Sequence, residues 1–184
     1  MKQTFQKSKA LEVLSFFFGH PYSEAYVREV ARALKMSAST VLRGLVALEK
    51  AGLLERRETR NATYFKANMT PEFRAHKIAY TISRIAASGI VGKVRARSRG
   101  LNCFLLYGSA ARGEDGENSD YDFLVIAAEC GITGTELGEN LRRETSLKKL
   151  TIGEWKETSK KNRAFYLEVI SDSFPLYGKK PVMD

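Results

Sequence analysis

The amino-acid sequence predicts an α+β protein in which a basic, mostly helical half precedes a small α/β domain with a mixed sheet. Residues 8–51 contain three stretches of helix-spaced apolar residues, and a two-stranded hairpin pattern follows them. Residues 101–126 contain two short apolar runs on either side of a polar turn. The two halves of the chain also differ in charge. Residues 1–100 contain 19 Lys and Arg and 7 Asp and Glu, whereas residues 101–184 contain 11 Lys and Arg and 14 Asp and Glu.

Three helices are predicted in the first half. The first spans Ser8 to Phe18, where the apolar residues recur at helical spacing until Gly19 and Pro21 interrupt them. Ser23 is a candidate N-cap for a second helix from Glu24 to Leu34. Ser37 is a candidate N-cap for a third helix that ends near Ala51, because Gly52 supplies a C-terminal stop.

A hairpin and a linking segment follow these helices. Residues 53–58 and 63–67 flank the polar turn Thr59-Arg60-Asn61-Ala62, which predicts two antiparallel strands. Thr70-Pro71 predicts the start of another helix, since proline is favoured at the first helical position. We therefore expect a first domain over residues 1–69 and linking helices over residues 70–100.

The third predicted helix carries a resemblance. Ser37-Ala38-Ser39-Thr40-Val41-Leu42-Arg43 and Leu48-Glu49-Lys50-Ala51-Gly52-Leu53-Leu54 resemble the recognition helix and following strand of bacterial and archaeal winged helix-turn-helix repressors. The resemblance covers about residues 5 to 68. It implies that the third helix enters the major groove of double-stranded DNA and that the hairpin meets the backbone or minor groove. The residues implied to contact DNA are Ser39, Thr40, Arg43, Arg56, Arg57 and Arg60.

The excess of positive charge in residues 1–100 favours a polyanionic partner for this domain. Two alternatives stay open at this point. The helices can serve only for packing while the arginines are solvated, and some winged helices bind proteins instead of DNA.

Two carboxylates mark the second half of the chain. Asp120 and Asp122 open the apolar run from Phe123 to Ile126, which predicts a buried strand. Alternate strand residues face the same side, about 6.6 Å apart, so the two carboxylates are expected side by side. Adjacent anions repel unless a cation neutralises them, and Mg²⁺ is commonly held by one or two carboxylates and substrate phosphates. Asp120 and Asp122 are therefore candidate catalytic residues and ligands of Mg²⁺, with Mn²⁺ as the other candidate.

A glycine-serine turn precedes this pair. Gly108-Ser109 ends the apolar run Phe104 to Leu106. Glycine allows a close approach of the backbone to a ligand, and N–H groups at a turn or helix start bind phosphate. Arg112 follows in the same turn, where its guanidinium is a candidate phosphate partner or else a solvated arginine. We expect Gly108, Ser109 and Arg112 to bind a nucleotide through its phosphate groups.

These two motifs carry a second resemblance. Gly108-Ser109, ten intervening residues and then Asp120-Tyr121-Asp122-Phe123 are similar to the nucleotidyltransferase superfamily of DNA polymerase beta, and to its minimal prokaryotic nucleotidyltransferases. The similarity covers roughly residues 90 to 180, so we assign residues 101–184 to this domain. It implies an NTP as donor of a nucleoside monophosphate and, because minimal members are often antitoxins that modify a ribonuclease, a toxin-like protein as one candidate acceptor.

One departure from the superfamily pattern bears on catalysis. A third carboxylate usually comes from a later strand, but the predicted strand Leu147 to Ile152 carries Lys148 and Lys149 there. Glu144 and Glu154 flank that strand as substitutes without the expected placement. Two functions therefore stay open: a Mg²⁺-dependent nucleotidyltransferase, or a transcriptional regulator in which a degenerate transferase domain senses nucleotide or forms a homodimer.

Several other classes are not expected. No apolar run approaches the roughly 20 residues of a membrane span, and the amino terminus lacks the pattern of a signal peptide. Cys103 and Cys130 are expected to be reduced thiols, which favours the cytoplasm. The turn acids are expected to be solvated rather than ligands; they are Glu114, Asp115 and Glu117.

Overall fold

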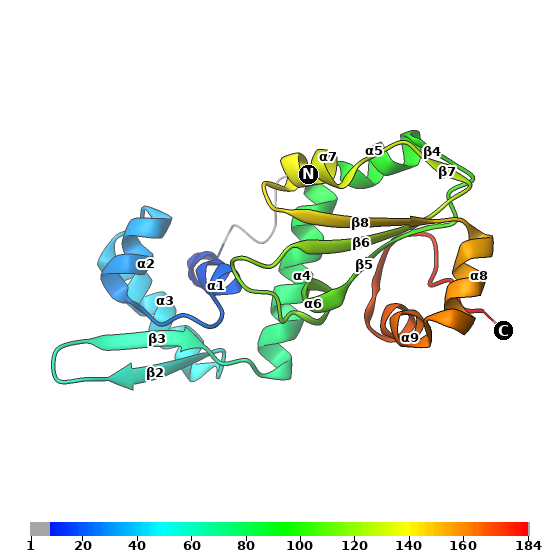
Figure 1. Cartoon of the computed structure of the whole chain (residues 1–184). Coiled ribbons are helices and arrows are strands. Elements are labelled where there is room, and N and C mark those ends of the chain that lie inside the picture. The colour runs from blue at the N-terminus through cyan, green and yellow to red at the C-terminus, as the bar shows by residue number, and fades with distance from the viewer. Residues whose placement is uncertain (1–7, 184) are drawn as a thin grey trace. The chain divides into compact units, whose positions relative to one another are not determined.

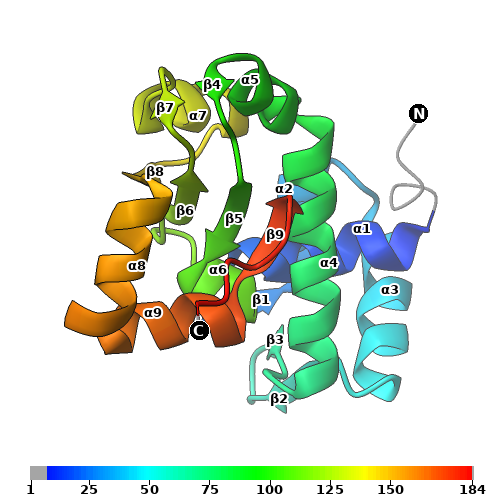
Figure 2. The same cartoon turned by 90° about the vertical axis from the view of Figure 1, so that its right-hand side faces the viewer.

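The computed structural model describes residues 8–183 and divides the chain into two compact units, Met1–Tyr80 and Thr81–Asp184. The division lies inside the long helix α4 (Pro71–Ala87), within the segment predicted to link the domains. Figures 1 and 2 show the elements of both units. None of the helices in residues 8–183 has the length and apolarity needed to cross a membrane.

From residue 8 up to α4, the first unit contains three helices and a small antiparallel sheet in the order β1-β3-β2. Before α4 its elements are α1 (Lys9–Gly19), β1 (Ala25–Tyr26), α2 (Val27–Leu34), α3 (Ala38–Lys50), β2 (Leu54–Glu58) and β3 (Thr63–Ala67). The predicted order of three helices and a hairpin is confirmed. The predicted start of the second helix at Glu24 is wrong, because Ala25 and Tyr26 pair with β3 and leave Tyr26 as the N-cap.

Local sequence explains the position of α3. The Ser37 hydroxyl accepts a hydrogen bond from the Thr40 N–H at 3.2 Å, as predicted for an N-cap. Val41, Leu45 and Leu48 are buried in the core of the unit. Gly44 lets α1 approach closely, since a Cβ at this position would lie 2.9 Å from a methyl group of Val13. One face of α3 is thus fixed against α1, and the other face is left for solvent or a partner.

The second unit is built on a mixed four-stranded sheet, with the order β8-β6-β5-β9. The β6–β8 pair is parallel and the other two pairs are antiparallel, so the predicted mixed sheet is confirmed. After α4 the elements are α5 (Ile90–Ala96), β4 (Ser98–Arg99), β5 (Cys103–Tyr107), α6 (Gly108–Arg112), β6 (Tyr121–Ile126), β7 (Glu129–Cys130), α7 (Gly134–Leu141), β8 (Thr145–Leu150), α8 (Ile152–Lys161), α9 (Arg163–Asp172) and β9 (Phe174–Tyr177).

Both faces of this sheet are buried, because β5 and β6 alternate their side chains between two apolar clusters. Phe104 and Phe123 belong to the cluster that includes residues of α5 and α7. Leu105 and Leu124 belong to the cluster with Trp155 and residues of α9. Figure 2 shows α8 and α9 together beside the sheet. This two-sided burial explains why β5 and β6 are continuous apolar runs in the sequence.

Strand register determines which motif residues meet. Tyr107, the last residue of β5, pairs with Asp122 near the start of β6. The parallel strand β8 places Ser146 beside Asp122 on the other side. The glycine-serine turn, which begins α6, and the aspartate pair therefore lie at the same end of the sheet.

Candidate functional site

The two motifs of the second unit are in direct contact. Gly108 has a φ of +71°, and a Cβ built on it would lie 2.5 Å from Oδ2 of Asp122. The missing side chain of Gly108 therefore makes the space that the Asp122 carboxylate occupies. Ser109, the next residue, is half-buried within α6, and Asp120 is exposed two residues before Asp122. The structure thus places Asp122 against Gly108, the residue before Ser109, and near enough to Asp120 for that carboxylate to raise the Asp122 pKa.

The surroundings of Asp122 make its ionised form unfavourable. Burial raises the pKa of the Asp122 carboxyl above its ordinary value, and Asp120 and Glu168 raise it further. Burial likewise raises the pKa of the neighbouring Tyr107 hydroxyl to about 12, with smaller contributions from the same carboxylates. Ionised Asp122 is therefore costly at this place, chiefly because it is buried and secondly because two carboxylates lie near it, although Arg112 lowers its pKa; a bound cation would reduce this cost.

Arg112 lies at the end of α6, where three carboxylates surround its guanidinium. It pairs with Glu114 at 3.0 Å and, from α9, with Glu168 at 3.2 Å and Asp172 at 3.6 Å. The Glu114 hydrogen bond raises the pKa of Arg112, with further contributions from Glu168. Binding of a phosphate by Arg112 would have to replace some of these carboxylates.

Sequence analysis missed the two acids of α9 that reach this site. Glu168 and Asp172 are four residues apart, so they lie on one side of their helix. That spacing could have indicated that one side of this helix is acidic. It could not indicate that this side faces Arg112, because that contact depends on the packing of α9 beside α6.

The residues considered as a third carboxylate lie in different places. Ser146, not an acid, is the neighbour of Asp122 on β8, and Lys148 stacks over the ring of Phe165 with 4.1 Å between Nζ and the ring centroid. The Glu154 carboxylate accepts a hydrogen bond from the Thr151 N–H, so it caps α8 at the other end of β8. Glu144 is exposed, and its carbonyl accepts a hydrogen bond from the Tyr121 N–H. Within residues 8–183 no group of three or more His, Cys, Asp or Glu is arranged to hold a metal ion.

The turn that carries Asp120 is fastened by a buried ion pair that the sequence did not predict. Asp115 is 1% exposed and pairs with Arg143 at 3.1 Å, so its expected solvation is wrong. The Arg143 guanidinium also donates to the carbonyls of Ser119 at 2.6 Å and Gly116 at 2.5 Å. It lies over the ring of Tyr121, 4.4 Å from the centroid. One side chain therefore holds both ends of the turn.

The donor set fits a divalent cation held by two carboxylates and completed by ligand or water oxygens. Asp120 and Asp122 supply hard oxygen atoms. Burial, together with the neighbouring carboxylates of Asp120 and Glu168, raises the pKa of Asp122, and a bound cation would offset that cost of ionisation. The set does not fit a site that needs a third carboxylate from the neighbouring strand, because β8 contains no acidic residue and places Ser146 beside Asp122.

The raised pKa gives a prediction for the metal-free protein. Since the fold favours the protonated form of Asp122, this group stabilises the protein below its unfolded pKa, near 3.8, and that contribution is lost as the pH rises through the folded pKa. Asp122→Asn should therefore raise the Tm at neutral pH, with a gain that disappears near about pH 4. Thermal unfolding across this pH range measures the effect, and the exposed Glu139→Gln is the control. A lower Tm for Asp122→Asn at neutral pH would contradict this account.

In the first unit, the residues expected to read base edges are not equally available. Ser39 and Arg43 are exposed on α3. The Thr40 hydroxyl lies 2.8 Å from that of Ser37, so it takes part in the helix cap. Of the three, Ser39 and Arg43 present the more accessible polar groups.

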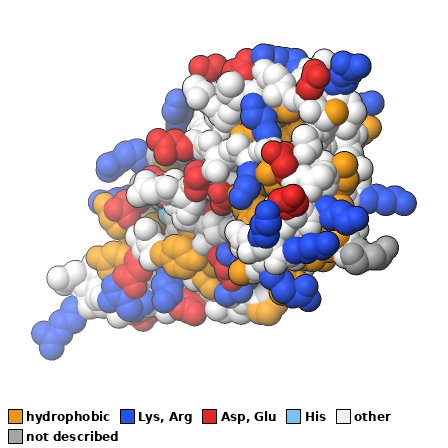
Figure 3. All heavy atoms as spheres, turned by 45° about the vertical axis from the view of Figure 1, so that its right-hand side comes forward, with side chains coloured by type: hydrophobic (Ala, Val, Ile, Leu, Met, Phe, Trp, Pro, Cys, Tyr) orange, Lys and Arg blue, Asp and Glu red, His pale blue; other side chains and the backbone are white. Residues whose placement is uncertain are grey.

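The three hairpin arginines also differ. Arg56 pairs with Glu58, and Arg57 makes a two-point ion pair with Glu24 and stacks over a tyrosine ring. Arg60 is exposed at the tip of the hairpin. Figure 3 shows Lys and Arg side chains interspersed with acidic ones over the face in view. Although the first half of the chain has an excess of positive charge, two of the three hairpin arginines, Arg56 and Arg57, are already paired with acidic residues.

Comparison with known families identifies the first unit. Residues 7–56 match the family model described as bacterial regulatory protein, ArsR family, and this segment includes α1, α2, α3 and the start of the hairpin. The predicted winged helix-turn-helix is thereby confirmed. A search among curated proteins found no match.

Several solved structures are similar to the chain at low identity. A toxin–antitoxin structure with AMP-PNP has 19% identity and a TM-score of 0.38, covering 54% of this chain and 74% of that one. The toxin–antitoxin MntA–HpeT, in a mutant form, has 20% identity and a TM-score of 0.39, covering 50% and 72%. A protein from Sulfolobus solfataricus proposed to be a nucleotidyltransferase has 20% identity and a TM-score of 0.35, covering 55% and 87%.

Proposed function

We propose that this protein binds duplex DNA through its first unit and transfers a nucleoside monophosphate from an NTP to an acceptor in its second unit, with Mg²⁺. The observation that carries the second part is the contact between the two motifs. The Asp122 carboxylate occupies the space beside Gly108, and Asp120 lies two residues earlier, just before β6 begins. A phosphate-binding turn is thus adjacent to a pair of metal-ligating oxygens, which is the combination that nucleotidyl transfer requires.

The side chains of this site have separable roles in the proposal. Asp120 and Asp122 hold the cation, which when bound neutralises charge on the triphosphate. Gly108 leaves room for the Asp122 carboxylate, and the N–H groups that follow it donate to phosphate oxygens. Arg112 orients a phosphate by exchanging Glu168 or Asp172 for it.

The acceptor follows from the motif resemblance rather than from the geometry. The spacing of Gly108-Ser109 and Asp120-Tyr121-Asp122 is similar to that of minimal nucleotidyltransferases, many of which modify a ribonuclease partner. A hydroxyl group on a toxin-like protein is therefore the acceptor class that we propose to test first.

A second candidate function is favoured by one observation. The strand β8 beside Asp122 carries no acid: Ser146 is the neighbour of Asp122, and Lys148 and Lys149 stand where a third carboxylate is expected. Within residues 8–183 no cluster of three acids completes the site. With two carboxylates the unit can bind a metal–nucleotide complex without transferring it. The chain would then be a winged-helix regulator whose DNA affinity responds to nucleotide.

Transfer and binding are separated by one set of measurements. The full chain is incubated with Mg²⁺ and each of the four α-labelled NTPs, with and without a candidate toxin-like partner. We expect incorporation that Asp120→Asn and Asp122→Asn abolish and that the control Glu129→Gln, an exposed acid elsewhere in the unit, retains. Mg²⁺-dependent NTP binding without incorporation would favour the regulator, and absence of NTP binding would refute both uses of this site.

The DNA-binding part is tested by the salt dependence of affinity. If the first unit contacts phosphates, the logarithm of the binding constant for duplex DNA should fall with the logarithm of salt concentration, with a slope near −0.9 per contact. Arg43→Ala and Arg60→Ala should each reduce that slope by about one contact, because both side chains are exposed. Tight binding that is insensitive to salt would refute this mode.

A further inference from the structure

The exposed face of α3 carries an apolar pair between two cations. The face that packs inward contains Val41, Gly44, Leu45 and Leu48. On the opposite side Leu42 is 46% exposed and Val46 is partly exposed, one helical turn apart. Arg43 and Lys50 are exposed beside them. An outer helix face is usually polar throughout, so these two aliphatic side chains require an explanation.

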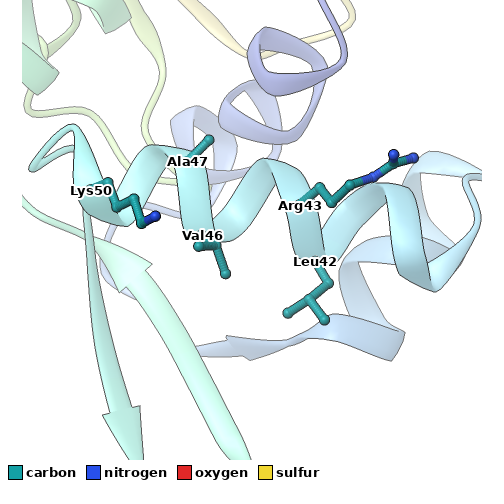
Figure 4. A pocket seen from close by; sticks show the side chains of 5 residues that line it. All are labelled: Leu42, Arg43, Val46, Ala47 and Lys50. Carbon is teal, nitrogen blue, oxygen red and sulfur yellow. The ribbon is translucent and has the colours of Figure 1, made fainter.

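The same side chains line a hollow in the surface. Leu42, Arg43, Val46, Ala47 and Lys50 line a shallow, open hollow of about 330 Å³ along α3. Figure 4 shows Leu42 and Val46 extending from the same side of the helix, with Lys50 one turn further along. The wall of the hollow is therefore mainly aliphatic, with a positive charge toward each end.

The two cations beside this hollow are available to a partner. Among residues 8–183 no carboxylate forms an ion pair with Arg43 or Lys50, in contrast to Arg56 and Arg57 of the hairpin. A surface with exposed positive charge on both sides of an aliphatic strip complements a ligand that presents methyl groups between two rows of phosphates. The major groove of duplex DNA has this pattern, because thymine places its C5 methyl group there.

We propose that Leu42 and Val46 contact the methyl groups of thymines in the major groove, so that the protein prefers A·T-containing sites. This inference rests on the DNA binding proposed above and specifies which base feature the first unit recognises. Side chains four residues apart on a helix are about 5–6 Å apart, a separation that spans neighbouring or next-neighbouring base pairs. Arg43 and Lys50 hold the helix in the groove through phosphates or base edges, while the aliphatic pair provides the selectivity.

Replacing thymine by uracil tests this directly, since it removes only the methyl group. The full chain is titrated with three duplexes of equal length: alternating A·T, the same sequence with dU for every dT, and a G·C duplex. We expect the dT duplex to bind about four- to fifteenfold more tightly than the dU duplex, as for burial of one or two methyl groups. Leu42→Ala and Val46→Ala should bring the ratio of the two affinities close to one and leave the salt slope unchanged.

Two controls accompany these variants. Tyr22→Ala removes another exposed apolar side chain of the same unit, 65% exposed and outside α3, and should keep the full dT preference. Arg43→Ala should weaken binding to both duplexes and lower the salt slope while the preference persists.

The possible failures are distinguishable. Salt-dependent duplex binding with equal affinity for dT and dU would overturn the thymine inference and leave DNA binding intact. Absence of duplex binding would refute the DNA-binding proposal itself, and with it the inference. If Leu42→Ala changes the sedimentation behaviour of the DNA-free protein but not its dT preference, the strip is an interface between copies of the chain, and the inference is likewise overturned.

Discussion

Gly108→Ala is expected to remove nucleotide binding from the second unit. The new methyl group would lie 2.5 Å from Oδ2 of Asp122 and 3.3 Å from its Cγ, so either the carboxylate or the start of α6 must move. A displacement of about 1 Å in such a site can reduce catalysis roughly hundredfold. The φ of +71° adds strain of about 1–2 kcal/mol for any residue with a side chain.

A matched glycine separates the steric effect from the backbone strain. Gly89 has a φ of +77° in the same unit, and a Cβ on it would meet no atom within 4 Å. Gly89→Ala should therefore lower the Tm by a similar strain contribution and retain Mg²⁺-dependent NTP binding. Calorimetric titration of both variants with NTP, alongside thermal unfolding, measures the difference. Equal nucleotide affinities for the two variants would show that the Gly108–Asp122 contact is unimportant.

Arg143→Met should give the largest loss of stability in the second unit. The substitution keeps much of the aliphatic volume but removes the ion pair between Arg143 and the carboxylate of Asp115, whose side chain is 2% exposed. Removing one partner of a buried ion pair destabilises a protein by about 3–5 kcal/mol. Two carbonyls of the turn, those of Ser119 and Gly116, lose a donor as well.

The single tryptophan of the chain makes this loss measurable. Trp155 is buried in the second unit, so its emission during urea unfolding reports on that unit. Arg142→Met, which removes the same charge from the exposed neighbouring residue, should change the free energy of unfolding by less than about 0.5 kcal/mol. Adding Asp115→Asn to Arg143→Met should restore part of the loss, because it removes the buried negative charge. Unfolding of Arg143→Met at the wild-type urea concentration would contradict the assignment.

The same variant links stability to the site. Because Arg143 fastens the turn that leads into Asp120, its loss should also weaken Mg²⁺-dependent NTP binding by the second unit. Arg143 does not touch the proposed ligand, so it acts as a positioning residue. Rescue of stability by Asp115→Asn without rescue of NTP affinity would show that the contacts to the two carbonyls, rather than charge balance, position Asp120.

Local signals in the sequence were sufficient for much of the fold. Ser37 and the apolar spacing after it predicted α3, and the polar turn at 59–62 predicted the β2–β3 hairpin. The second helix was placed three residues too early, since Ala25 and Tyr26 join β3 through a pairing that local sequence does not encode. Such long-range pairings override the N-cap preference of Ser23.

Some features of the candidate site could likewise be predicted from the sequence, and others could not. The spacing of Gly108-Ser109 and the aspartate pair was evident in the sequence, because each motif lies at the end of an apolar run. The contacts of Asp115 with Arg143 and of Arg112 with Glu168 join residues far apart in the chain. Charge patterns could not predict these pairs, because any of several acids and bases in this unit could have met.

The sequence by itself determined the succession of helices and strands and the two short motifs, since these depend on caps, turn residues and apolar period. Only the tertiary structure decided that Asp122 fills the space left by Gly108, that Ser146 is the β8 neighbour of Asp122, and that Leu42 and Val46 face outward. Strand register and helix packing bring distant segments into contact, and these are fixed by the whole fold rather than by neighbouring residues.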